Sequence, residues 1–245
     1  MRTRLDLEMT RRGLAESREG AQRLIMAGRV RVNSRPASKA DLRVDAETAI
    51  AIVGATSEYA SRGGYKLAAA IDHFQVDIAG RRVLDVGAST GGFTDVLLRR
   101  GAASVIALDV GYGQLAEKLR RDARVITIDR TNIRNVTSAD LPYPPDLVTI
   151  DTSFISLRLV LPAVMAIAAP NADIIALVKP QFEVGKGKVG KGGIVRDAAM
   201  RKDALDSILA FARAAGLEIA GSVESPITGA EGNIEYLALF RKRSA

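Results

Sequence analysis

The chain has 245 residues and is 47% hydrophobic, which suits one large domain or a large and a small one and excludes global disorder. Lysine and arginine total 35 against 28 aspartates and glutamates. This net charge of +7 favours an anionic partner, with nucleic acid ahead of an anionic membrane. The absence of cysteine excludes disulfides, thiolate metal sites and thiol catalysis, and the single histidine, His73, argues against a histidine-based zinc site or proton shuttle.

The first residues, MRTRLDLEMTRRGL, are charged throughout and lack the apolar segment typical of a signal peptide. The longest apolar stretch, residues 157–169, is interrupted by Arg158 and Pro162. It is also shorter than the roughly 18 apolar residues that span a bilayer. We therefore expect a cytoplasmic protein without a membrane span.

Residues 1–55 predict a small, basic α+β domain, with 11 lysines and arginines against 7 acidic residues. Its predicted elements are, in chain order, a helix over 4–13, a helix over 17–28, a strand over 29–33, a turn over 33–36 and a strand over 46–53. Ser17 can cap the start of the second helix, and Gly28 can end it. Residues 56–63 have the composition of a linker.

Residues 64–245 alternate strands with helices. Strands are predicted over 82–86, 104–110, 124–129, 146–151 and 172–180, and helices over 65–74, 92–101, 114–122, 156–169 and 196–216. The last two strands, 217–225 and 233–242, are expected to form an antiparallel hairpin at one edge. This alternation predicts a Rossmann-like α/β domain with a mostly parallel sheet, whose ligands bind at the carboxyl ends of the strands.

The stretch VLDVGASTGG has two interpretations. Gly87–Gly91 matches the G-x-S-x-G pattern of serine hydrolases with Ser89 as nucleophile, but that triad needs a histidine later in the chain, and His73 precedes it. Alternatively, the glycines let a cofactor approach the backbone, and Asp109, 22 residues after the first glycine, binds its ribose. Because Ser89 replaces the second glycine of G-x-G-x-x-G, the pattern disfavours a dinucleotide pyrophosphate and favours S-adenosylmethionine (SAM).

The stretch VGKGKVGKGG, residues 184–193, matches two phosphate-binding patterns, G-x-G-x-x-G and G-x-x-x-x-G-K. The second pattern requires Ser or Thr next, to hold Mg²⁺, and Gly192 stands there instead. Two interpretations stay open. The segment is either a solvated flexible loop or a mobile basic lid that contacts a phosphate backbone.

Two sets of motifs carry a resemblance to known families. The N-terminal RLD and SREGAQRLIMAGRVRVN resemble an S4 domain, a small RNA-binding module. The motifs SRGGYKL, VLDVGASTGGFTD, LDVGYGQL, DRTNIR, TIDTSFISL, LVKPQFE and GNIEYL resemble the FtsJ-like, SAM-dependent RNA 2′-O-methyltransferases. Together they cover nearly the whole chain and match the TlyA family, known both as hemolysins and as methyltransferases of cytidine 2′-hydroxyls in 16S and 23S ribosomal RNA.

The resemblance implies three groups of site residues and no metal. The catalytic tetrad would be Lys66, Asp151, Lys179 and Glu235. SAM would be bound by Gly87, Ala88, Ser89, Thr90, Gly91, Gly92, Phe93, Asp109 at the ribose and Asp129 near the adenine amino group. In the S4-like domain, RNA phosphates would be contacted by Arg4, Arg11, Arg18, Arg23, Arg29 and Arg31. The lid interpretation of residues 184–193, which rests on their basic composition, adds Lys186, Lys188 and Lys191 as RNA contacts.

The implied reaction explains these residue types. A ribose 2′-hydroxyl is a poor nucleophile near neutral pH, whereas the methyl group of SAM is already activated by the sulfonium. The protein must therefore place the hydroxyl in line and remove one proton, which a lysine can do where burial or a neighbouring cation favours its neutral form. Lys179 is the expected base and Lys66 the neighbouring cation, with Asp151 and Glu235 orienting the two lysines.

The S4-like domain would position ribosomal RNA, within assembled ribosomal subunits, with the target nucleotide flipped out of its helix. Three alternatives stay open. The first is a membrane-active hemolysin, although the sequence contains neither an apolar span nor a long amphipathic segment. The others are a non-catalytic RNA-binding or ribosome-assembly factor and a small-molecule methyltransferase, which the basic N-terminal domain disfavours.

Overall fold

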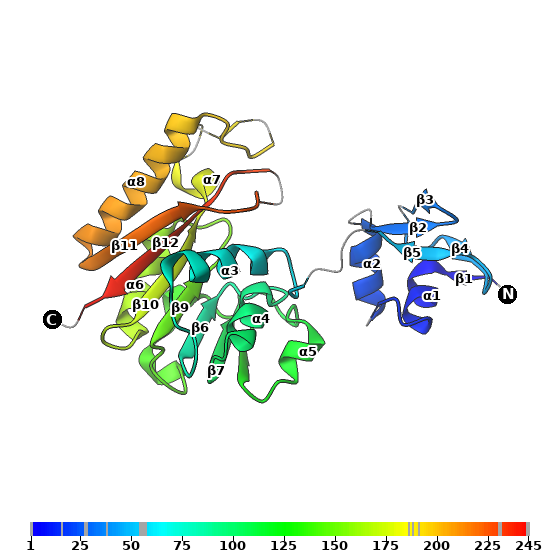
Figure 1. Ribbon diagram of the computed structural model, residues 1–245, viewed down its shortest axis with the longest axis horizontal. Helices are drawn as coiled ribbons and strands as arrows, with labels where there is room; N and C mark the ends of the chain where they lie inside the picture. The colour runs from blue at the N-terminus through cyan, green and yellow to red at the C-terminus, as the bar shows by residue number, and fades with distance from the viewer. Residues whose placement is uncertain are drawn as a thin grey trace. The chain divides into compact units, whose positions relative to one another are not determined.

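The computed structural model describes residues 2–15, 17–26, 29–37, 39–53, 58–185, 187, 189–190, 192–229 and 232–243. The chain divides into two compact units, Met1–Thr56 and Ser57–Ala245 (Figure 1).

The N-terminal unit packs two short helices against small antiparallel sheets. Its elements are β1 (Thr3–Arg4), α1 (Leu5–Arg11), α2 (Arg18–Met26), β2 (Val30–Val32), β3 (Arg35–Pro36), β4 (Arg43–Val44) and β5 (Ile50–Ile52). β2 lies between β3 and β5, and β1 pairs with β4. The core is formed by Leu5 and Met9 of α1 and by Ala21 and Ile25 of α2, pairs spaced four residues apart on one helix face.

The structure confirms the predicted cap of α2 and corrects the predicted turn after β2. The Ser17 hydroxyl accepts a hydrogen bond of 3.0 Å from the Gly20 backbone N–H, which confirms it as the cap of α2. The predicted end at Gly28 lies outside the described residues. The predicted turn over 33–36 is wrong in its second half, because the positive φ of Asn33 and Ser34 completes a two-residue turn and leaves β3 free to pair with β2.

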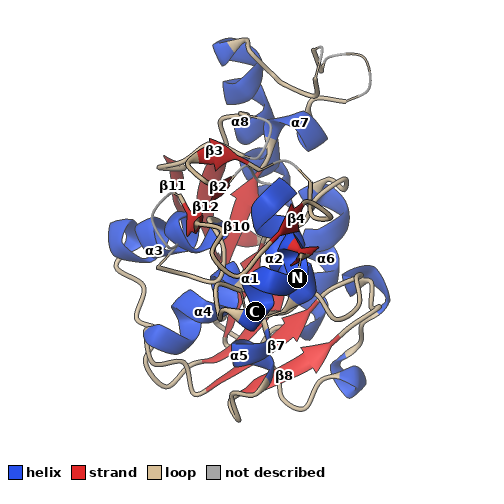
Figure 2. Cartoon of the chain, turned by 90° about the vertical axis from the view of Figure 1, so that its right-hand side faces the viewer, coloured by secondary structure: helices blue, strands red, loops and turns tan. Residues whose placement is uncertain are grey.

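The second unit is a seven-stranded sheet with helices on both faces (Figure 1, Figure 2). Its elements are α3 (Gly63–Phe74), β6 (Arg82–Val86), α4 (Gly92–Arg99), β7 (Ser104–Leu108), α5 (Glu117–Arg120), β8 (Val125–Ile128), two 3₁₀ turns (Ile133–Asn135 and Ser138–Asp140), β9 (Leu147–Ile150), α6 (Leu157–Ile167), β10 (Asp173–Val178), α7 (Pro180–Glu183), α8 (Ala198–Ala214), β11 (Leu217–Glu224) and β12 (Tyr236–Lys242).

The strands lie in the order β11-β12-β10-β9-β6-β7-β8, and all pairs from β10 to β8 are parallel. β12 runs antiparallel to both β10 and β11. This confirms the predicted Rossmann-like fold with an antiparallel last strand. Successive residues of the central strands pack on opposite faces, for example Val83 with α3 and α4 and Leu84 with α6 and α8, which explains the nearly continuous apolar strands in the sequence.

Two helices differ from the prediction. The helix expected over 114–122 is reduced to α5, Glu117–Arg120. The short helix α7 was not predicted; it begins with Pro180, a residue well suited to the first helical position. Both differences lie in segments that follow the carboxyl ends of strands, where the site is built.

Asp85 is an acidic residue in the middle of the sheet. Its side chain is fully buried, and the hydroxyls of Thr94 and Thr149 donate hydrogen bonds of 2.7 and 2.9 Å to it. Burial outweighs these hydrogen bonds and raises the pKa of Asp85 to about 6. The sheet therefore holds a carboxyl group that is more easily accommodated when it is protonated.

Replacing Asp85 with asparagine is expected to stabilise the protein at alkaline pH. The pKa is raised from 3.8 to about 6 in the folded state, so the stability linked to the bound proton is present below about pH 4 and is lost as the pH rises through about 6. This rise in the Asp85 pKa corresponds to about 3 kcal/mol of unfolding free energy. Asp85→Asn should raise Tm relative to the wild type at pH 8, and this gain should shrink steadily towards pH 4. A gain that is the same at every pH would contradict this account.

Candidate active site

A glycine-rich loop, residues 87–91, joins the end of β6 to the start of α4 at Gly92. Gly87 has a φ of +82°, and a Cβ atom at this position would lie 2.5 Å from the carbonyl oxygen of Asp151. Only glycine fits here, because the loop passes directly against the residue that follows β9. The close approach brings the loop backbone and the Asp151 side chain to the same edge of the sheet.

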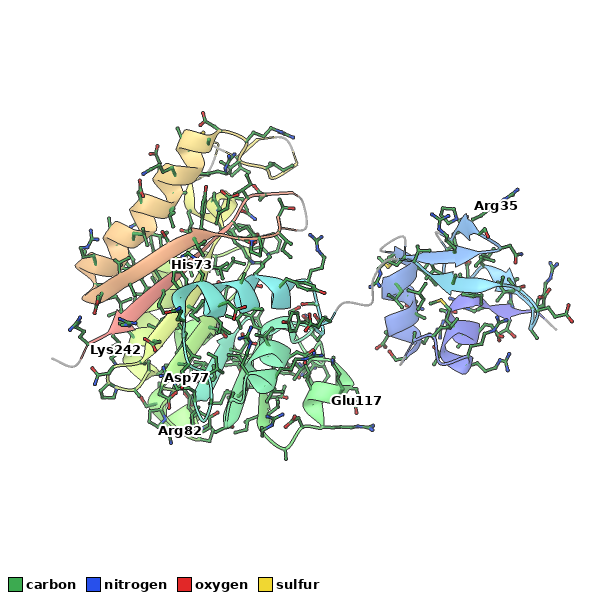
Figure 3. The ribbon with its side chains drawn as sticks, in the orientation of Figure 1. Arg35, His73, Asp77, Arg82, Glu117 and Lys242 are labelled. Atoms are coloured by element: carbon green, nitrogen blue, oxygen red, sulfur yellow. The ribbon has the colours of Figure 1, made fainter. Side chains whose placement is uncertain are left out.

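Asp109, which follows β7, holds this loop. Its carboxylate accepts hydrogen bonds of 2.8 Å from the Ser89 backbone N–H and 2.7 Å from the Gly111 backbone N–H. Each carboxylate oxygen keeps a further lone pair for a ligand. His73, labelled in Figure 3, is exposed on α3, and its ring lies edge-on to that of Phe74. The structure therefore gives Ser89 no histidine partner and excludes the hydrolase interpretation.

Asp129, the residue after β8, accepts a hydrogen bond of 3.0 Å from the Gly113 backbone N–H. The segment between Asp109 and Asp129 also carries exposed apolar surface that the sequence analysis did not identify. Val110 is 70% exposed and Tyr112 is 67% exposed. The Arg130 guanidinium lies 4.2 Å from the centre of the Tyr112 ring. A flat apolar ligand could lie on this surface.

Two neighbouring cavities open at this edge of the sheet. The first, here called the loop cavity, has a volume of about 270 Å³ and is lined by residues 61–63, 87–90, 92–93 and 227–228. The second, here called the lysine cavity, has a volume of about 360 Å³, and its walls include Lys179, Gln181, Phe182 and Glu235. Lys66 and Asp151 line both cavities, whereas Gly91, Asp109 and Asp129 line neither.

The four charged residues of the expected tetrad meet as two ion pairs. Lys66 Nζ lies 2.5 Å from Glu235 Oε2, and Lys179 Nζ lies 2.6 Å from Asp151 Oδ1. Glu235 is only 2% exposed, and both lysines are 8% exposed. Pairing offsets the large cost of burying these charges, and each pair joins segments distant in the sequence.

Lys179 has a second partner that the sequence analysis missed. Its Nζ donates a hydrogen bond of 3.0 Å to Ser153 Oγ. Because Asp151 and Ser153 together occupy two of the three donor positions of the ammonium group, the rotation of Lys179 about its last bond is fixed. The only sequence signal was the position of Ser153, two residues after Asp151 in TIDTSFISL.

Phe154 is a second residue in this motif that the sequence analysis missed. It lines the lysine cavity, is 91% exposed, and has a φ of +63°, which is rare for a bulky residue. Its ring centre lies 5.3 Å from that of Phe182, which lines the same cavity. The cavity mouth therefore presents an aromatic surface.

Three of the arginines expected to contact RNA form ion pairs within the N-terminal unit. Arg4 and Arg18 each lie 3.0 Å from the buried Asp6, and Arg11 lies 2.6 Å from Glu8. Hydrogen bonds from Arg4 above all hold the pKa of Asp6 well below its usual value. These arginines have a structural role in addition to any contact with RNA.

Other basic residues of this unit lie elsewhere. Arg31 is exposed on β2 and donates a hydrogen bond of 3.2 Å to the Ser34 carbonyl. Arg35, which was not among the expected residues, is exposed on β3 of the same hairpin (Figure 3). Arg29 Nε lies 3.5 Å from the Val53 carbonyl. Four expected RNA contacts lie outside the described residues and side chains, namely Arg23, Lys186, Lys188 and Lys191.

Comparison with known proteins identifies both units. The profile of the FtsJ-like methyltransferases matches residues 59–242, about three quarters of the chain. The chain belongs to the FtsJ-like methyltransferase family. Residues 3–50 of this methyltransferase match the S4 domain, so the resemblance expected from the motifs is confirmed for both units.

Three similar proteins share nearly the whole length of this methyltransferase. The 16S/23S rRNA (cytidine-2′-O)-methyltransferase TlyA of Mycobacterium tuberculosis is 49% identical over 99% of this chain and 91% of its own. Hemolysin A of Brachyspira hyodysenteriae is 41% identical over 97% of this chain and 99% of its own. The solved structure of a candidate hemolysin from Streptococcus thermophilus is 41% identical, with a TM-score of 0.78 over 100% of this chain and 90% of its own.

In the part of the chain that the structure describes, every helix is too short or too polar to cross a bilayer.

Replacing Gly87 with alanine is expected to abolish SAM binding and to destabilise the protein by more than about 2 kcal/mol, because the new Cβ atom strains the backbone and meets the Asp151 carbonyl. Gly80 is a matched control, since its φ of +73° is similar but no atom lies within 4 Å of the added Cβ. Gly80→Ala should cost about 1 kcal/mol and leave SAM affinity unchanged in calorimetric titrations. Equal SAM affinities for the two variants would contradict this account of the loop.

Proposed function

We propose that the protein transfers a methyl group from SAM to the ribose 2′-hydroxyl of a cytidine in ribosomal RNA. The observation that carries this proposal is the pair of ion pairs, Lys66–Glu235 and Lys179–Asp151, at the junction of two cavities. One cavity suits a methyl donor and the other an acceptor. The name of the M. tuberculosis relative supplies the substrate class, since that protein is called a cytidine 2′-O-methyltransferase of 16S and 23S ribosomal RNA.

The residues at the glycine-rich loop fit SAM. When bound, SAM supplies a methyl group on a positively charged sulfonium. The loop cavity, lined by backbone of the loop and by Asp151, would take the amino-acid and sulfonium end. Asp109 keeps acceptor positions for ribose hydroxyls, and Asp129 would accept from the adenine amino group. The exposed Val110 between them offers an apolar surface to the adenine ring.

The lysine cavity would receive the target nucleotide. Phe154 and Phe182 offer aromatic faces on which an unstacked base can lie, as RNA-binding proteins commonly arrange. A nucleotide held there would present its ribose to the charged residues. Flipping it out of the RNA costs only a few kcal/mol, which contacts of this kind can offset.

Lys179 is the proposed general base. The acceptor hydroxyl has to lose its proton as its oxygen forms the new bond, and Lys179 in its neutral form would accept this proton. The neutral amine would donate its two N–H groups to Asp151 and Ser153, which hold Nζ in the cavity, and would turn its lone pair to the hydroxyl. The Asp151 carboxylate stabilises the positive charge that Lys179 carries once it has accepted the proton. Lys66 would orient the ribose and balance the Asp151 carboxylate, while the buried Glu235 holds Lys66 in position.

The S4 unit would supply affinity for RNA through phosphate contacts. The exposed Arg31 and Arg35 on the β2–β3 hairpin are the contacts proposed here, whereas Arg4, Arg11 and Arg18 form ion pairs with acidic partners within the unit. Assembled ribosomal subunits are the proposed substrate, and such a substrate is met in the cytoplasm.

The proposal is tested by tritium transfer from labelled SAM to purified 30S and 50S subunits, followed by mapping of the modified ribose. Labelled 2′-O-methylcytidine is the expected product. A protein that makes liposomes leak but transfers no label would contradict the proposal and favour the activity suggested by the name of the B. hyodysenteriae relative.

Lys179→Ala is expected to lower methyl transfer by about 10³-fold or more while SAM affinity stays within about threefold, because the variant lacks the base but keeps the loop cavity. Lys118→Ala is the control, since Lys118 is also ion-paired in this unit, 3.0 Å from Asp95, but lines neither cavity. The control should keep its activity. Normal turnover by the Lys179 variant would remove the residue from the mechanism.

Replacing both Arg31 and Arg35 with alanine is expected to raise KM for ribosomal subunits without changing SAM affinity. The slope of log affinity against log salt should also become shallower by about two, because two phosphate contacts are lost. Arg121→Ala, at an exposed arginine of the catalytic unit, serves as the control. An unchanged salt dependence would show that the hairpin does not contact RNA.

A further inference from the structure

The glycine-rich stretch after α7 has a structure that phosphate binding does not explain. Among the described residues, the Gly193 N–H donates to the Gly190 carbonyl at 3.0 Å, and the Gly190 N–H donates to the Ile194 carbonyl at 3.2 Å. Gly192 and Gly193 have φ values of +79° and +76°. Glycine is needed at both positions because two successive left-handed residues reverse the chain, and we call residues 192–195 the 192–195 turn.

Asn233 clamps the backbone of this turn through two hydrogen bonds of its side chain. The side chain is 2% exposed. Its Nδ2 donates a hydrogen bond of 2.8 Å to the Gly193 carbonyl, and its Oδ1 accepts one of 2.9 Å from the Val195 N–H. A carboxamide is the side chain that offers a donor and an acceptor side by side, so it satisfies both backbone groups at once.

The clamp belongs to one cavity only. Gly193 and Asn233 both line the lysine cavity, together with Glu235, which stands two residues after Asn233. Neither Gly193 nor Asn233 lines the loop cavity. A change at Asn233 should therefore affect the acceptor nucleotide and leave SAM binding intact.

We propose that Asn233 is a positioning residue for the RNA substrate, which fixes the 192–195 turn as a wall of the lysine cavity so that the acceptor ribose is held against Lys179. This inference rests on the proposed methyl transfer to RNA. In-line transfer is sensitive to displacements of about 1 Å, so a loosened wall lowers kcat even when the RNA stays bound elsewhere.

Two substitutions separate the clamp from general stability. Asn233→Ala removes both hydrogen bonds. Asn233→Asp keeps the shape and the acceptor for the Val195 N–H but sets a carboxylate oxygen against the Gly193 carbonyl. Tyr143→Phe is the control. It removes a hydroxyl that donates a hydrogen bond of 3.0 Å to Ser104 Oγ in the same unit, and Tyr143 lines neither cavity.

Four measurements are made on each full-length variant, namely tritium transfer to ribosomal subunits, SAM affinity by calorimetry, Tm, and hydrogen exchange of the Val195 amide. Both Asn233 variants should lose about tenfold or more in kcat for subunits with SAM affinity within about threefold, and Tyr143→Phe should keep its kcat. Exchange of Val195 should accelerate in Asn233→Ala, which reports release of the turn directly.

Two results would overturn the inference. One is a kcat within tenfold of the wild type in Asn233→Ala despite faster exchange at Val195. The other is a parallel loss of SAM affinity in both Asn233 variants, which would indicate a general structural role. Failure of the wild type itself to methylate subunits would instead overturn the proposed function, so the two failures are distinguishable.

Discussion

The site depends on the parallel pairing of β6 with β9 at the centre of the sheet. The register sets Val86 beside Ile150, and the Asp151 N–H then donates to the Val86 carbonyl at 2.9 Å. After this pair of residues, the segments that follow β6 and β9 leave the sheet side by side, and Gly87 lies against the Asp151 carbonyl. A shift of the register by one residue would move the side chains of β9 to the opposite face and carry Asp151 away from the loop.

Burial of charge is the second constraint on the site. Three of the four tetrad side chains are almost inaccessible to solvent, and each ion pair joins residues far apart in the sequence, 169 residues apart for Lys66 and Glu235. Removing one member of such a pair leaves the other buried and uncompensated, which costs several kcal/mol. Loss of activity in a tetrad variant therefore has to be read beside its stability, and the exposed neighbour Ser153 is a cleaner place to test how Lys179 is oriented.

The sequence predicted what depends on local pattern. Alternation of apolar strands with helices predicted the mostly parallel sheet and the antiparallel pair at its edge, whereas the order of the strands came from the structure. The expected tetrad was named from the family resemblance, and only Asp151 and Lys179 could also be singled out because they follow predicted strands. The shortened α5 was missed because the loop from Asp109 to Gln114 is held by Asp109 and Asp129, a tertiary effect that overrides helix propensity.

The sequence could not reveal contacts made across the fold. Asn233 meets Gly193 and Val195 only because β12 is inserted beside β10, and no spacing rule links residues that lie 38 and 40 positions apart. The ion pairs of Arg4 and Arg18 with Asp6 could not be predicted for the same reason. Arg4 and Arg18 looked available for RNA in the sequence, and both form ion pairs with Asp6 in the structure.

The two cavities share Lys66 and Asp151 as common walls. Ligands that touch the same side chains are energetically coupled, and the coupling is reciprocal. If one ligand raises the affinity of the other by some factor, the second ligand raises the affinity of the first by the same factor. The order in which donor and acceptor bind is then a matter of kinetics, while the free energy of the ternary complex is the same by either route.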